Sequence, residues 1–111
     1  MTASVLGFAE TFLMSQVRQA VREVEPTAQV LLFGSRARGD ATPDSDWDLL
    51  VLLEGAVDYR REAAIQHRLY DLELEADAIL STIVLSRAEW GSPLFRATPF
   101  HRSVVRDAVE L

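Results

Sequence analysis

The spacing of apolar and polar residues divides the first half of the chain into one helix and two strands. Apolar residues recur every three or four positions up to Val24, and this period predicts an amphipathic helix over residues 8–25. The runs QVLLF (29–33) and WDLLVLL (47–53) are short and almost wholly apolar, so they predict buried strands. Residues 35–38 are expected to form a brief helical turn, followed by the loop sequence GDATPDS.

The second half of the chain repeats this alternation. A second amphipathic helix is predicted over residues 58–74, and the run DAILSTIVLS (77–86) predicts a third strand inside the sheet with both faces covered. Thr98 and Pro99 have the residue types of an N-cap and a first-turn proline, so a last helix is expected to reach about Val109. The order of elements predicts an α/β (α+β) fold, in which a small mixed sheet of three or more strands is flanked by helices.

Length and composition limit the kinds of protein to consider. The chain has 111 residues, of which 49% are hydrophobic and 25% charged, so we expect one folded domain over residues 1–111. It has no cysteine and two histidines, which excludes disulfides and thiolate metal sites and leaves too few ligands for a zinc cluster.

The charge balance disfavours direct nucleic-acid binding. The formal net charge is −6, whereas a surface that binds many phosphates needs clustered basic residues. No apolar segment reaches the roughly 20 residues that cross a bilayer, and the first residues lack the basic region of a signal peptide, so no membrane association and a cytoplasmic location are expected. The acidic run DLELEAD (71–77) is read either as a solvated face or as a negative docking surface.

Gly34 and Ser35 follow the first predicted strand, where the chain must turn sharply. Glycine allows another group to approach the backbone closely, and a serine that opens a helical turn supplies a hydroxyl for an anion such as phosphate. The alternative is an ordinary turn with a capping serine.

Asp46 and Asp48 stand at the start of the second predicted strand. Residues two apart in a strand project to one face, with Cα atoms about 7 Å apart. Two carboxylates so placed repel each other unless a cation lies between them, and Mg²⁺ prefers such oxygen ligands. The alternative is a polar strand edge in solvent. Ten residues separate Ser35 from Asp46, and the ends of adjacent strands are expected to meet in one crevice.

Together these residues resemble the minimal nucleotidyltransferase (MNT) domains of the DNA polymerase beta-like nucleotidyltransferase superfamily. The resemblance is carried by Gly34, Ser35, Asp46 and Asp48 within LFGSRARGDATPDSDWDLLV. It implies a nucleotidyltransferase fold and the Mg²⁺-dependent transfer of a nucleoside monophosphate from a nucleoside triphosphate to a hydroxyl, with ATP as the expected donor. By position, Gly34 and Ser35 would bind the terminal phosphates, and Asp46 and Asp48 would bind the metal ions.

Two further assignments follow from the resemblance. Arg38 is expected either to bind phosphate or to pair with Asp40 or Asp44, and for Arg36 the surface pairing is favoured. Active members of the family usually add a third carboxylate from a later strand. Asp77 is the candidate for this third metal ligand or base, if it opens the third strand facing the cleft. Ser81 at that position would instead leave one metal ion a ligand short.

The resemblance also implies partners. Many MNT proteins act as antitoxins of HEPN-domain toxins, so a nucleoside triphosphate and a HEPN-type protein are the expected partners. The alternative is a catalytically weak MNT subunit that neutralises its partner by binding alone. Transfer to a small molecule such as an aminoglycoside is less favoured, because such enzymes generally need an added domain or a dimer cleft. The oligomeric state is left open, with a homo-oligomer among the alternatives.

Overall fold

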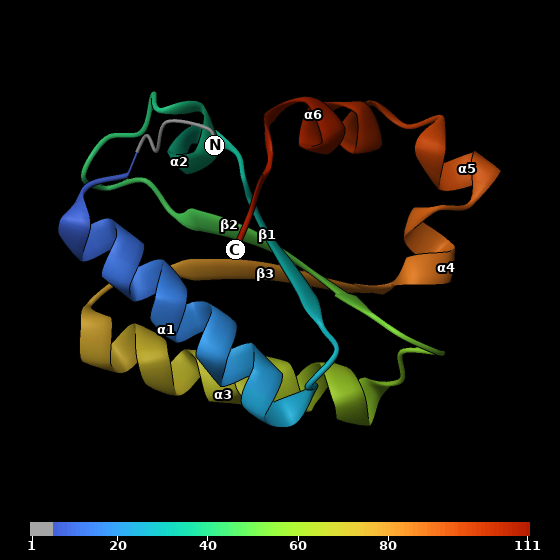
Figure 1. Cartoon of the computed structure of the whole chain (residues 1–111), viewed down its shortest axis with the longest axis horizontal. Helices are drawn as coiled ribbons and strands as arrows, with labels where there is room; N and C mark the ends of the chain where they lie inside the picture. The colour runs from blue at the N-terminus through green and yellow to red at the C-terminus, as the bar shows by residue number, and fades with distance from the viewer. Residues whose placement is uncertain (1–5) are drawn as a thin grey trace.

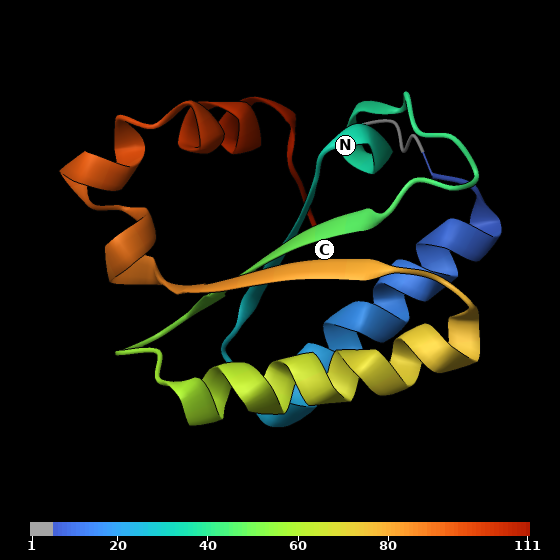
Figure 2. The ribbon, with the colours of Figure 1, turned by 180° about the vertical axis from the view of Figure 1, so that it is seen from behind.

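A four-stranded sheet separates two groups of helices in the computed structural model, which describes residues 6–111 (Figure 1). Helices α1 and α3 lie side by side on one face of the sheet, and α6 lies on the other, as the view from behind also shows (Figure 2). The elements in chain order are α1 (Phe8–Val24), β1 (Gln29–Phe33), α2 (Ser35–Arg38), β2 (Trp47–Leu53), α3 (Tyr59–Ala76), β3 (Leu80–Ser86), α4 (Arg87–Trp90), α5 (Pro93–Arg96), α6 (Pro99–Asp107) and β4 (Val109–Glu110).

The sheet is mixed, with the strand order β3-β2-β1-β4. Strand β1 is antiparallel to both β2 and β4, whereas β2 and β3 are parallel and are joined through α3. The register pairs Phe33 with Asp48 and Asp48 with Ser81. The end of β1 and the starts of β2 and β3 therefore lie at the same end of the sheet, where these strands begin or finish. This architecture confirms the predicted fold class.

Strand β2 contributes to both cores of the molecule. Leu49, Val51 and Leu53 belong to the larger core with α1 and α3, while Leu50 and Leu52 pack with residues of α6 in a smaller core. Because successive side chains of a strand point to opposite faces, Trp47 and Asp48 also point to opposite faces of the sheet. Trp47 joins the larger core, so Asp48 lies on the α6 face.

The prediction that the third strand lies inside the sheet is wrong. Strand β3 is at the edge, and Ser81 and Ile83 are exposed. Side chains of α3 occupy part of its free edge: Glu73 accepts a hydrogen bond from the Leu80 amide and Gln66 donates to the Thr82 carbonyl, each at 2.9 Å. These contacts use backbone groups that another strand would otherwise pair with.

The end of the chain also differs from the prediction. Thr98 is the N-cap of α6 as predicted, and its hydroxyl accepts from the His101 amide at 3.1 Å. The helix ends at Asp107, however, because residues 109–110 form a short strand, β4, that pairs with β1. The short helices α4 and α5 were not predicted, although the capping serines Ser86 and Ser92 are their local signals.

None of the helices within residues 6–111 is long and apolar enough to cross a membrane.

A forked ion pair joins the end of α1 to the start of α3. Arg61 donates from Nε and Nη2 to the two carboxylate oxygens of Glu25 at 2.9 and 2.8 Å, and from Nη1 to the Glu54 and Ala56 carbonyls at 2.8 Å each. The hydrogen bonds from Arg61 hold the pKa of Glu25 below its ordinary value.

Replacing Arg61 with Met is therefore expected to lower the melting temperature most at neutral pH. A carboxyl group with a lowered pKa in the folded state adds stability above its unfolded pKa of about 4.3, and this stability is lost as the pH falls through the folded pKa. Thermal denaturation should show that the difference in melting temperature between the native protein and Arg61→Met becomes smaller as the pH falls from neutral to acidic. Glu25→Gln should behave in the same way. A difference in melting temperature that stays constant down to acidic pH would contradict the conclusion that the ion pair between Arg61 and Glu25 stabilises the fold.

Candidate active site

A glycine turn at the end of β1 forms the first part of the site. Gly34 has φ 74° and ψ −158°, and the short helix α2 begins at the next residue. The Gly34 carbonyl accepts hydrogen bonds from the amides of Ala37 and Arg38 at 3.1 and 3.0 Å, which fixes the direction of α2. Because β1 and β2 are antiparallel and Phe33 pairs with Asp48, this turn lies beside the start of β2.

The structure brings Gly34 into direct contact with Asp48. A Cβ atom on Gly34 would overlap Asp48 Oδ2 and would lie 3.2 Å from Asp48 Cγ. Gly34 is also in a backbone region with positive φ that is almost restricted to glycine. The turn and the carboxylate can therefore lie this close only because position 34 has no side chain.

Asp46, Asp48 and Arg38 form an electrostatically coupled group. Burial raises the pKa of Asp48, the negative charge of Asp46 raises it further, and the positive charge of Arg38 lowers it. Asp48 is half-buried, whereas Asp46 is exposed just before β2. A cation between the two carboxylates would relieve both the burial of charge and the repulsion.

Arg38 and Ser35 present polar groups beside these aspartates. Arg38 Nε pairs with Asp40 at 3.2 Å, and both side chains are largely exposed, so the surface pairing considered from the sequence is present. The charge of Arg38 also acts on Asp48 and on Asp107 at the end of α6. Within residues 6–111 the Ser35 hydroxyl makes no hydrogen bond, which leaves it available to a ligand.

The expectation that Arg36 pairs with an aspartate on the surface is wrong. Its side chain is only 12% exposed and forms an ion pair with Glu10 at 3.0 Å. It also donates to the carbonyls of Ser45 at 2.9 Å and Pro43 at 3.3 Å, and its guanidinium lies 4.3 Å from the centre of the Trp47 ring. Arg36 thus holds the loop that leads into Asp46. No local pattern indicated this role, because its partners come from separate segments.

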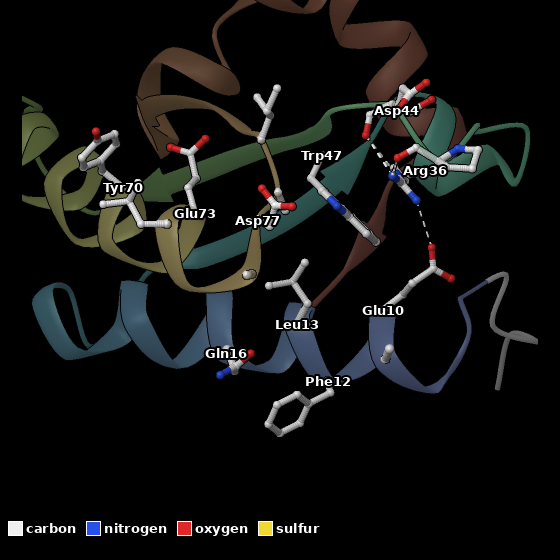
Figure 3. A pocket seen from close by; sticks show the side chains of 17 residues that line it. Glu10, Phe12, Leu13, Gln16, Arg36, Asp44, Trp47, Tyr70, Glu73 and Asp77 are labelled. Carbon is white, nitrogen blue, oxygen red and sulfur yellow. Dashed lines mark hydrogen bonds and ion pairs between the residues drawn. The ribbon is translucent and has the colours of Figure 1, made fainter.

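The expectation that Asp77 opens the third strand is also wrong. Strand β3 begins at Leu80, and Asp77 is the C-cap of α3 in the left-handed conformation, with φ 51° and ψ 47°. Aspartate is one of the few residue types besides glycine that tolerate this conformation. Asp77 lines a pocket beside Trp47, and Asp46 and Asp48 are not among the residues that line this pocket (Figure 3).

The expected third carboxylate is therefore not found beside Asp46 and Asp48 within residues 6–111. No group of three or more acidic or histidine side chains in the described part of the chain is placed to hold a metal ion. The residue of β3 that pairs with Asp48 is Ser81, which is exposed at the same end of the sheet. This pairing corresponds to the alternative considered from the sequence, in which a serine occupies the third position.

Comparison with known proteins gives a family and a fold. A family model described as a nucleotidyltransferase domain matches residues 14–107, a range that contains Gly34, Ser35, Asp46 and Asp48. No curated protein matches the sequence. One chain in a crystal structure of a mutant MntA–HpeT toxin–antitoxin complex is similar, with a TM-score of 0.60 and 21% sequence identity over 88% of this chain and 70% of that chain. At that identity the similarity concerns the fold. Because the family model covers most of the chain, the chain belongs to the nucleotidyltransferase domain family and is by family a transferase.

Proposed function

We propose that the protein moves a nucleoside monophosphate from a nucleoside triphosphate, ATP in the first instance, to a hydroxyl of a partner macromolecule, with Mg²⁺ as cofactor. The observation that carries this proposal is the contact between Gly34 and Asp48. It brings the turn suited to phosphate within reach of the carboxylates suited to a metal ion. A triphosphate and a divalent cation can then share one site.

The residues fit Mg²⁺ in their chemistry. Asp46 and Asp48 offer hard oxygen ligands, and the raised pKa of Asp48 reflects burial and repulsion that a divalent cation would offset. When bound there, Mg²⁺ would neutralise charge on the phosphate oxygens and orient the α-phosphate for in-line attack.

The protein groups around the aspartates would position the triphosphate. The Ser35 hydroxyl, which makes no hydrogen bond within residues 6–111, would donate to a terminal phosphate oxygen, while Gly34 lets the phosphate approach the backbone. The exposed Arg38 guanidinium would add a forked contact to phosphate once it leaves Asp40. Positioning and electrostatic stabilisation of this kind supply most of the rate in phosphoryl chemistry.

A specific observation favours a second candidate function. Ser81 pairs with Asp48, and Asp77 lies at the end of α3, so β3 supplies no carboxylate beside Asp48 at the position where the family resemblance implies a third one. The second candidate is a catalytically weak subunit that neutralises its partner by binding alone.

The partner is proposed from the similar structure. That structure contains the toxin–antitoxin pair MntA–HpeT, and the fold it shares with this chain supports an antitoxin role here, with a HEPN-type toxin as partner. The net charge of −6 would favour association with a basic surface.

Label transfer distinguishes the two candidates. The protein is incubated with Mg²⁺, ATP labelled at the α-phosphate and the purified product of the neighbouring gene. Transfer predicts label on that product with the native protein and with Asp71→Ala, a control at an exposed aspartate of α3, but not with Asp46→Ala. Equal labelling by Asp46→Ala would contradict the mechanism. Tight binding of the partner without label from any of the proteins would favour the binding function.

A further inference from the structure

A groove lies next to the proposed site, on the side of β2 that faces α1 and α3. It has a volume of about 820 Å³ and runs between the first half of α1 and the end of α3 (Figure 3). The residues that line it include Trp47, the residue between the two aspartates, together with Arg36 and Ser45. The groove and the proposed site therefore share the segment that contains Asp46.

Large apolar side chains line this groove and remain exposed. The exposed fractions are 60% for Phe12, 55% for Tyr70, 66% for Leu74 and 60% for Ile79. Single exposed apolar residues are ordinary on a protein surface, but several around one concave surface are typical of an interaction site. Tyr70, Leu74 and Ile79 come from the end of α3 and the turn before β3, whereas Phe12 comes from α1 and its ring points away from α3 (Figure 3).

The charges around the groove are acidic. Among residues 6–111, the acidic residues that line it are Glu10, Asp44, Glu73 and Asp77, and the one basic residue is Arg36. The ion pair of Arg36 with Glu10 at 3.0 Å leaves three acidic groups without a basic partner in the lining. An occupant that combines apolar residues with lysine or arginine would complement both features.

We propose that this groove binds a basic, amphipathic helical segment of the partner protein. Apolar residues on one side of such a helix would contact Phe12, Leu74 and Ile79, and its basic residues would lie near Asp44 and Asp77. The proposal rests on the proposed function in one respect, namely that the segment belongs to the acceptor protein. A second copy of this chain is a poorer occupant, because its net charge of −6 would oppose docking on an acidic surface.

Docking there would bring the partner close to the reacting groups. Pro43, Ser45 and Trp47 line the groove, and the Ser45 carbonyl that Arg36 binds directly precedes Asp46. A segment seated in the groove would therefore rest on the loop that positions Asp46. The partner would be held at the same end of the sheet as the proposed triphosphate site.

Two synthetic peptides test the proposal. Both are about 18 residues long, so that they can form a helix, and both have leucine at i, i+3, i+4 and i+7; one has lysine and the other glutamate at the remaining positions. Fluorescence anisotropy should show binding of the lysine peptide alone. The double variant Phe12→Ser/Leu74→Ser should weaken this binding about tenfold or more. Leu94→Ser, which changes a residue that is 85% exposed on α5, is the matched control and should bind as the native protein does.

The charge contribution is tested separately. Asp44→Asn/Asp77→Asn should weaken binding of the lysine peptide and reduce its dependence on salt, because two acidic groups of the groove are removed. Asparagine tolerates the left-handed conformation at position 77, so the helix end is preserved.

Several results would overturn the proposal. They are no binding of the lysine peptide, equal binding of the glutamate peptide, or unchanged binding by Phe12→Ser/Leu74→Ser. A dimer of the native protein that is lost in the same double variant would assign the groove to a second copy instead. Asp46→Ala should bind the lysine peptide as the native protein does. If the native protein bound the lysine peptide but transferred no label to its partner, the proposed enzyme activity would be rejected and the proposed docking site would still be supported.

Discussion

Replacing Asp48 with Asn is expected to lower nucleotidyl transfer by about 10³-fold or more, because one of the two carboxylates that we propose as metal ligands is lost. The same change should raise the melting temperature of the protein without metal. Opposite effects on activity and stability are expected where a functional group is held in an unfavourable environment. The amide side chain has nearly the same shape as the carboxylate it replaces beside Gly34, so the local packing is preserved.

The sign of the stability effect follows from the pKa of Asp48. Burial and the charge of Asp46 raise this pKa in the folded state. When a carboxyl group has a raised pKa in the folded state, the free energy of unfolding decreases as the pH rises from the unfolded pKa of the group, about 3.9, through its folded pKa. Above the folded pKa the cost is fully present, and the neutral amide removes it. The side chain is partly exposed and therefore screened by solvent, so we expect a gain of only about 0.5 kcal/mol.

Thermal denaturation with and without Mg²⁺ and ATP checks both parts of this prediction. Ligands that bind only the folded state stabilise it, so the native protein should gain stability from Mg²⁺ and ATP together, and Asp48→Asn should gain little. Asp71→Asn, at an exposed position of α3, should match the native protein under both conditions. If Asp48→Asn proved less stable than the native protein in EDTA, or gained as much from Mg²⁺ and ATP, our account of Asp48 would be wrong.

Local signals in the sequence were enough for the elements that hold the candidate site. The period of apolar residues predicted α1, and the runs QVLLF and WDLLVLL predicted β1 and β2 at their observed bounds. Gly34 was read as a site of close backbone approach, and the group that approaches it is Asp48. These features depend on residues close in sequence or on a simple antiparallel pairing.

The predictions that failed depend on the order of strands, which local patterns do not encode. The apolar run of β3 predicts an interior strand, yet β3 is an edge strand whose free backbone groups are partly hydrogen-bonded by side chains of α3. Asp77 precedes that run in sequence, but the left-handed end of α3 places it three residues before the strand. Only the register shows that Ser81 pairs with Asp48. The ion pair of Arg36 is not encoded locally either, because its partner Glu10 is distant in sequence.

Replacing Gly34 with Ala is expected to affect both the fold and the reaction. Alanine is disfavoured at φ 74° and ψ −158°, and the strain should cost about 1–3 kcal/mol of folding stability. The added Cβ would also overlap Asp48 Oδ2, so the carboxylate would have to rotate away from the turn. Displacing a reacting group by about 1 Å can cost about 100-fold in rate, so we expect a loss of transfer of at least that size.

Gly55 is a second glycine with positive φ, but it lacks the contact that Gly34 makes with Asp48. Gly55 has nearly the same φ, 73°, but its Cβ would meet only Arg61 Nη1 at 3.7 Å, which is an ordinary contact. Gly55→Ala should therefore lose stability while keeping transfer near the native rate. Both variants are compared by thermal denaturation and by label transfer at a temperature where each is folded.

The contact itself is tested by removing its other partner. In an Asp48→Ala background the overlap with Oδ2 no longer exists, so Gly34→Ala should cost less stability there than in the native protein. Chemical denaturation of the four proteins in this cycle gives the coupling energy directly. Equal costs of Gly34→Ala in the two backgrounds would mean that positions 34 and 48 do not interact. The turn that we propose to bind phosphate and the carboxylates that we propose to bind the metal ion would then have no physical link, and the proposed site would lose the observation on which it rests.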